Sequence, residues 1–233
     1  MSSLCVYDPV FGAFFIKTDA WTNCRNAVKN RLGETVFKQG YSATDPNGIT
    51  QALKTAYAEA GIKPLTPQGR ITAVDLKHTS DGTNQYQKLW ISMDLADDQI
   101  TISVDLGSDV AKRLLAKLNS VDTQSTVKIS AWATTEVRNG RSFINHCVSI
   151  KGADGVEIPA VSGLFAQAKA NADKLLEMLG TADKAVIESV RKAEQGKVFM
   201  AQMELIRAKF VNNSVDTANA EPESAPKVTE PSF

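Results

Sequence analysis

The feature that most constrains the fold is a strict alternation of side-chain type from Gln85 to Leu106 (QYQKLWISMDLADDQITISVDL). Successive side chains of a strand point to opposite faces, so an alternation of period two predicts extended chain. One face of the first predicted strand is aliphatic and carries Leu89, Ile91, Met93 and Leu95. The other face, which is plainly polar in an ordinary half-exposed sheet, carries Tyr86, Lys88, Trp90 and Ser92. The alternation resumes after residues 96–98, so we expect a hairpin whose outer face offers aromatic and basic groups.

The same reasoning extends over residues 69–159. The segment 70–77 is strand-like but changes phase near Ala73, which predicts a β-bulge. Residues 107–120 have apolar side chains at helical spacing, and Ser108 is placed to cap their N-terminal end, which predicts a short helix. Two further alternating stretches flank the hairpin loop Arg138-Asn139-Gly140-Arg141. The expected order is therefore strand, strand, strand, helix, strand, strand.

Helical spacing dominates on both sides of this region. Residues 1–68 are expected to form a mostly helical N-terminal extension, in which the aromatic cluster at 7–15 is explained by packing. Residues 160–211 are expected to form a C-terminal helical hairpin, with a kink or break at Gly196. Residues 212–233 lose the apolar periodicity and hold one lysine and four acidic residues, so we expect a disordered acidic tail.

The composition argues against several classes of protein. The 233 residues include 26 basic and 26 acidic side chains, so there is no global positive field. Three cysteines without a CxxC spacing predict neither a disulfide framework nor a zinc site. There is no glycine-rich phosphate loop, and His146 and Cys147 point to opposite faces of their strand, so we expect no enzymatic activity, metal or cofactor. A cytoplasmic protein is expected, because no apolar run approaches the ~20 residues of a membrane span.

Five short strands with a helix between the third and fourth resemble the OB-fold, a small Greek-key barrel. Over residues 69–159 the chain resembles single-stranded DNA-binding proteins of the phage or bacterial OB type. The resemblance implies an α+β fold, a five-stranded OB-like β-barrel with N-terminal and C-terminal helical extensions and a disordered tail. It also implies a protein that coats and protects single-stranded DNA during replication, recombination and repair, with little sequence specificity. A phage-encoded protein of this kind would act in the cytoplasm of its bacterial host.

Binding a single strand without reading its sequence needs rings that stack on bases, at ~1–3 kcal/mol per base, and cations that follow the phosphates. In an OB-fold the ligand lies over strands 2 and 3, between the loops that join strands 1–2 and 4–5. Trp90 shares a predicted face with Lys88, and Trp132 shares one with Lys128. The candidate nucleic-acid-binding residues are Lys77, Tyr86, Lys88, Trp90, Lys128, Trp132, Arg138, Arg141 and Phe143. Single-stranded RNA is the alternative ligand.

A second resemblance lies in the last residues. Single-stranded DNA-binding proteins of this kind often end in a flexible acidic segment with a terminal Phe, which recruits replication and recombination proteins. This chain ends Glu230-Pro231-Ser232-Phe233, and Lys227 and Ser232 depart from that pattern. The resemblance implies that Glu230, Pro231 and Phe233 bind such partners.

Other interpretations use the same residues. The helical extensions would remove Trp90 or Trp132 from a binding face if they covered them, and the lysines and arginines are also compatible with an ordinary solvated surface. The alternative function is a non-catalytic protein–protein or homo-oligomeric scaffold on the same barrel. A metal-dependent nuclease that uses Asp94, Asp97, Asp98 and Asp105 is a further alternative, although Asp97-Asp98 is typical of a turn.

Overall fold

The computed structural model describes residues 2–41, 44–80, 82, 85–138, 141–180 and 183–218. The side chains of residues 138, 141, 142 and 212–218 are outside that description. The strands are β1 (Ser3–Asp8), β2 (Ala13–Ile16), β3 (Gln68–Ser80), β4 (Gln85–Asp94), β5 (Gln99–Asp105), β6 (Thr126–Arg138) and β7 (Arg141–Gly152). The helices are α1 (Asp19–Leu32), α2 (Glu34–Phe37), α3 (Ile49–Glu59), α4 (Asp109–Leu118), α5 (Leu164–Leu179) and α6 (Lys184–Ala218).

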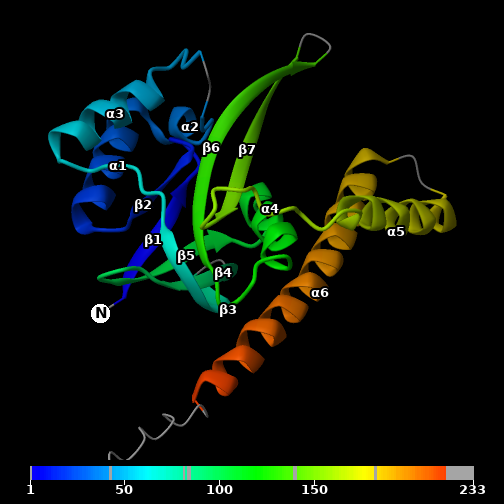
Figure 1. Ribbon diagram of the computed structural model, residues 1–233. Helices are drawn as coiled ribbons and strands as arrows, with labels where there is room; N and C mark the ends of the chain where they lie inside the picture. Colours follow the sequence, from blue (N-terminus) through cyan, green and yellow to red (C-terminus); the bar gives the residue numbers. More distant parts are fainter. Residues whose placement is uncertain are drawn as a thin grey trace, which may run out of the picture.

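These strands form one curled, mixed sheet in the order β2-β1-β5-β4-β3-β6-β7 (Figure 1). Neighbours are antiparallel except β1 and β5, which run parallel with Ser3 opposite Ile100. The fold is α+β, but the prediction of a five-stranded barrel is wrong, because the N-terminal strand pair extends the sheet. The predicted order of strand, strand, strand, helix, strand, strand is confirmed for β3 to β7 with α4. The predicted bulge is also present, between Ile71 and Ala73.

Strands β1 and β2 lie in the region predicted to be mostly helical. Alternation does not reveal them, because each has apolar side chains on both faces. Cys5 and Phe14 point into the core of the curled sheet, whereas Val6 and Phe15 pack under the N-terminal helices. A strand between two apolar layers is apolar throughout and shows no alternation. Strand β5 pairs with β1 and β4, so β7 pairs with β6 alone and forms one edge of the sheet.

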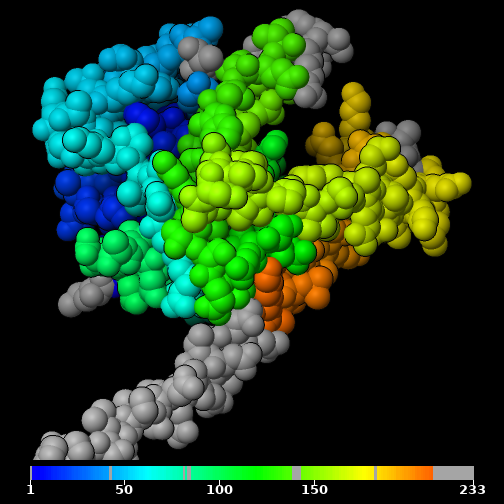
Figure 2. Space-filling model, viewed as in Figure 1, coloured from blue at the N-terminus to red at the C-terminus, as the bar shows by residue number. Residues whose placement is uncertain are grey.

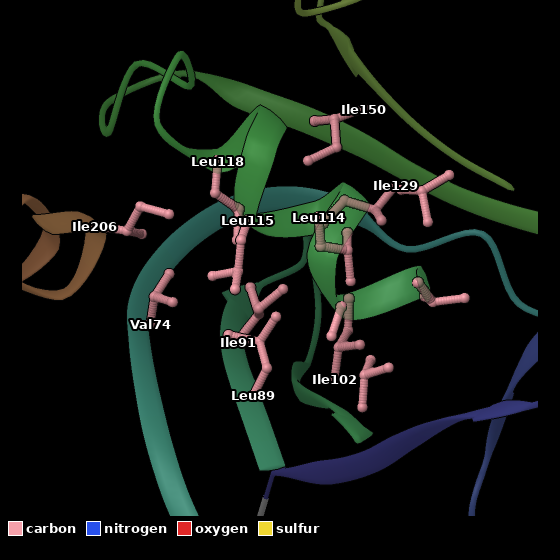
Figure 3. Close-up of a cluster of buried hydrophobic side chains, with 14 of the residues drawn as sticks. Val74, Leu89, Ile91, Ile102, Leu114, Leu115, Leu118, Ile129, Ile150 and Ile206 are labelled. Atoms are coloured by element: carbon pink, nitrogen blue, oxygen red, sulfur yellow. The ribbon is translucent and has the colours of Figure 1, made fainter. Parts of the chain in front are cut away.

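Helix α4 fills the concave side of the sheet. Ser108 accepts a hydrogen bond from the backbone N–H of Ala111 (3.2 Å), which caps the helix. Helical spacing then turns Leu114, Leu115 and Leu118 inward, where each is fully buried. Figure 3 shows them among side chains of the sheet and of α6, which include Val74, Leu89, Ile91, Ile102, Ile129, Ile150 and Ile206. The concave side of the sheet is therefore packed with apolar side chains and forms the core of the molecule.

The N-terminal helices α1, α2 and α3 cover the outer face of β1 and β2 (Figure 1). Asp8, at the end of β1, is fully buried and ties these layers together. It forms an ion pair with Arg25 of α1, and the Tyr57 hydroxyl of α3 donates a hydrogen bond to it (2.8 Å). The backbone N–H groups of Val10 and Phe11 also donate to Asp8 (3.0 and 3.3 Å). One carboxylate thus fixes the first hairpin relative to two helices.

The first hairpin also touches the long β6–β7 hairpin. At its turn, Gly12 has a positive φ of 80° and lies against Ala133 of β6. A Cβ at Gly12 would approach the Ala133 Cβ to 2.7 Å, so a side chain does not fit there. Glycine therefore lets the N-terminal strand pair close against β6.

Helices α5 and α6 form a hairpin that projects from the body of the molecule (Figures 1 and 2). Helix α6 packs on α4 and β3 through buried Phe199, Met203 and Ile206. It runs unbroken through Gly196 and continues to Ala218, past residue 212, where the disordered tail was predicted to begin. The predicted tail residues Glu230, Pro231 and Phe233 lie outside the described residues. In the part of the chain that the structure describes, every helix is too short or too polar to cross a membrane.

Candidate nucleic-acid interface

Four of the predicted binding residues lie together on the outer face of strands β3 and β4. Trp90 is opposite Asp75 of β3 on one side and Ser103 of β5 on the other. Lys88 is opposite Lys77, and Tyr86 follows two positions along the same strand face. Trp90 is partly exposed, so the helical extensions do not cover it. The structure therefore brings Lys77, Tyr86, Lys88 and Trp90 into one patch, which we call the β4 patch.

Each ring of the β4 patch has a lysine over it. The Lys77 Nζ lies 5.9 Å from the centroid of the Trp90 ring, and the Lys88 Nζ lies 5.2 Å from the centroid of Tyr86. Both distances are within the range of a cation–π contact. A base that stacks on either ring would meet a cation beside it, at the place where its own phosphate needs one.

Carboxylates balance these cations locally. The Lys77 Nζ is 3.1 Å from Asp75, and the Lys88 Nζ is 3.3 Å from Asp105. Burial alone would raise the pKa of Asp75, but its hydrogen bonds and the charges of Lys77 and Arg207 lower it overall. Ion pairs this exposed contribute about 0–1 kcal/mol, so an incoming phosphate can replace the carboxylates at small cost.

A groove of about 750 Å³ begins at the β4 patch and continues between the diverging ends of β1 and β5. Trp90, Lys88 and Ser103 line its first part, with Leu4, Val6 and Lys17 from the N-terminal strand pair and its end. Within the described chain, no group accepts a hydrogen bond from the buried Nε1 of Trp90. The groove thus combines an apolar wall, an indole, two lysines and the carboxylates of Asp105 and Asp109.

Tyr7 and His146 close the far end of the groove. The Tyr7 hydroxyl is 2.6 Å from Nδ1 of His146, and the two rings meet edge to face. Burial lowers the pKa of His146; of the smaller effects, Asp109 raises this pKa and Arg113 lowers it. Burial also raises the pKa of Tyr7. When neutral His146 carries its ring proton on Nε2, the Tyr7 hydroxyl donates the hydrogen bond and Nδ1 of His146 accepts it.

The remaining predicted residues lie on a different strand pair. Lys128 and Trp132 are exposed on the outer face of β6, and Phe143 is exposed on β7 opposite Glu136. Trp132 lines a separate pocket of about 480 Å³ together with residues at the start of α5. Arg138 and Arg141 are paired at the far end of this hairpin, but their side chains lie outside the described part. The structure therefore divides the predicted set into two groups on different parts of the curled sheet.

Sequence reasoning missed Lys17, Leu4 and Val6, and it favoured packing for Tyr7, with an oligomer or DNA contact as the alternative. The missed signal is the β-prone composition of two short runs, SLCVYD and AFFI, on either side of a turn that contains Pro9 and Gly12. Such runs predict a hairpin even without alternation.

Comparison with protein-family models, with curated proteins and with solved structures finds no match to this chain. Among the described residues, no group of three or more His, Cys, Asp or Glu side chains is placed to hold a metal ion. The chemistry that the β4 patch and its groove offer is stacking on two rings and neutralisation of anions by lysines.

Proposed function

We propose that the protein binds single-stranded nucleic acid, with little sequence preference, across the β4 patch and its groove. The observation that carries this proposal is the pairing of each exposed ring with a lysine, Trp90 with Lys77 and Tyr86 with Lys88. Stacking serves every base, because every base has a π-face, whereas cations follow the backbone. The role in coating and protecting single-stranded DNA during replication and recombination belongs to the same proposal.

The local charge balance sets the expected strength and salt dependence. Three lysines line or border the groove, Lys17, Lys77 and Lys88, and two of them are paired with carboxylates. If each neutralises one phosphate, the logarithm of the binding constant falls with the logarithm of salt concentration with a slope of about −2. Stacking on two rings, at ~1–3 kcal/mol per base, then supplies most of the affinity that remains at high salt.

The test is fluorescence anisotropy of labelled oligo-dT with the wild-type protein, Trp90→Ala and the matched control Trp132→Ala. Both variants remove an indole that is at least partly exposed on a strand, but only Trp90 belongs to the β4 patch. We expect Trp90→Ala to weaken binding about tenfold or more, in line with the loss of one stacked base, and Trp132→Ala to change it much less. Parallel titrations with single-stranded RNA and duplex DNA define the ligand class.

A specific observation also favours a protein–protein or homo-oligomeric scaffold. The tip of the α5–α6 hairpin exposes Met178 (83%) and Leu179 (59%), and such apolar groups can form an association surface. Sedimentation of the same proteins separates the two functions. If no oligonucleotide binds even at low salt while Trp90→Ala changes the sedimenting species, the scaffold replaces nucleic-acid binding.

A further inference from the structure

A second hollow lies beside the first, between α6 and the junction of β5 and α4. Its volume is about 540 Å³. Its apolar lining comes from Leu106, Phe199 and Met200. Lysines from two helices stand at its rim, Lys112 from α4 and Lys192 and Lys197 from α6. We call this hollow the α6 pocket. Flat apolar walls under a lysine rim suit a base with its phosphates, the same chemistry that the β4 patch offers.

The α6 pocket adjoins the groove of the β4 patch. Gly107 lines both hollows, and the adjacent residues Gln87 and Lys88 of β4 line one hollow each. The Leu106 N–H donates to the Gln87 carbonyl (2.9 Å), so one backbone connection forms the ridge between them. A nucleic-acid strand that leaves Lys88 would therefore reach the α6 pocket by passing over Gly107.

Gly196 lines the α6 pocket. It lies inside the continuous helix α6, where a glycine costs about 1 kcal/mol relative to alanine. A Cβ at this position would have no heavy atom within 4 Å, so packing does not require a glycine here. The missing side chain instead leaves the space between the lysines and Phe199 free. A position that lowers helix stability and is not needed for packing is consistent with a role in binding.

The lysines of the rim differ in how firmly they are held. Lys112 donates to Gln195 (3.1 Å) and lies 3.8 Å from Asp109. Lys197 is largely exposed and pairs with Glu194 (2.5 Å). Within the described chain, Lys192 has no ion-pair partner and is exposed. At least one cation of the rim is therefore free to meet a phosphate without displacing a carboxylate.

We propose that the α6 pocket is a second subsite for the same single strand. The strand stacks on the β4 patch, crosses the ridge at Gly107 and places a further base against the partly exposed Met200, with phosphates at Lys192 and Lys197. This inference rests on the proposed function and extends it, because it defines the path of the strand and assigns a ligand-binding role to α6. It predicts that the binding site is longer than the β4 patch alone.

The test is a length series of oligo-dT from about 4 to about 16 nucleotides, the range of OB-type sites, measured by anisotropy at several salt concentrations. The charge variant is Lys192→Gln with Lys197→Gln, and its matched control is Lys169→Gln with Lys174→Gln on the exposed side of α5. We expect the charge variant to bind the shortest oligomers like wild type and to bind the longest about tenfold more weakly. Its salt slope on long oligomers should be shallower by about 1.4, at about 0.7 for each lost phosphate contact.

A second pair of variants tests the pocket without changing charge. Gly196→Leu fills the open space, whereas Gly196→Ala keeps most of it and supports the helix. We expect Gly196→Leu to lose the gain in affinity with length and Gly196→Ala to keep it. The second subsite is overturned if the affinity of both test variants depends on oligomer length as the wild-type affinity does, or if both lose the same affinity at every length. Either result leaves the β4 patch intact. Failure of the wild-type protein to bind any oligomer overturns the proposed function itself.

Discussion

Removing the charge of Asp8 tests whether the N-terminal strand pair and its helices form one cooperative unit with the sheet. In Asp8→Asn the amide oxygen still accepts the backbone N–H groups of Val10 and Phe11, but Arg25 loses its anion. The Arg25 guanidinium, with only 18% of its side chain exposed, then remains as an unpaired charge. Breaking a buried pair in this way costs about 3–5 kcal/mol, and the retained hydrogen bonds place Asp8→Asn near 3 kcal/mol.

Asp8→Ala is expected to cost more. It also removes the acceptor of the Tyr57 hydroxyl and of the N–H groups of Val10 and Phe11, each worth about 1 kcal/mol, which brings the loss to about 6 kcal/mol. That is a large part of the ~5–15 kcal/mol by which a domain is stable. The neighbours of Arg25 strengthen the effect, because its guanidinium lies 5.0 Å from the ring centroids of both Trp21 and Phe37 and cannot move into water without disturbing them.

Urea unfolding, followed by tryptophan fluorescence and by far-ultraviolet circular dichroism, measures both losses as shifts of the transition midpoint. The companion variant is Asp8→Asn with Arg25→Met, which removes both charges. We expect the double variant to be more stable than Asp8→Asn, because an uncharged pair replaces an unpaired buried charge. A cost below about 1 kcal/mol for Asp8→Asn, or a double variant no more stable than the single one, would refute the reasoning.

Two further predictions concern the contacts that close the groove and the sheet. The pKa of His146 is lower in the folded protein than its unfolded value of 6.5, so the unfolded chain binds more protons. Stability should therefore fall as pH falls below about 6.5. His146→Gln, which keeps a hydrogen-bond acceptor, should flatten that part of the pH profile of stability measured by urea melts. Gly12→Ala should cost about 2–3 kcal/mol through its positive φ and the clash with Ala133. Gly155→Ala, with a similar φ of 78° but open space, should cost only about 1 kcal/mol, and equal losses would contradict the proposed clash.

The part of the fold that the sequence predicted is the part whose strands have one buried and one exposed face. In β4 the burial follows the alternation, with Leu89, Ile91 and Met93 buried between partly exposed neighbours. The phase change in β3 likewise appears as a bulge. Strands β1 and β2 carry no such signal, because helices cover one face and the core covers the other. The number of strands was therefore not predictable from alternation alone.

The candidate site shows a related limit. An alternation of period two predicts on which face of a strand a side chain lies, and it correctly placed Trp90 and Lys88 on the same face of β4. The alternation does not predict where a strand lies in a curled sheet. Trp132 was therefore assigned to the same predicted surface as Trp90, although it lines a separate pocket. Lys17, which lines the groove, and Lys192, at the rim of the α6 pocket, come from segments far from β4 in the sequence, and only the folded chain brings them near it.

The parallel pairing of β1 with β5 also affects how the chain is made. Ser3 cannot meet Ile100 until that residue has left the ribosome, and at about 5–20 residues per second the delay is about 5–20 s. During this time a strand with two apolar faces has no sheet to join, and contacts of such long sequence separation form slowly. Residues 3–16 are therefore exposed to aggregation until residues beyond 100 emerge. We expect the nascent chain to depend on a chaperone that shields residues 3–16.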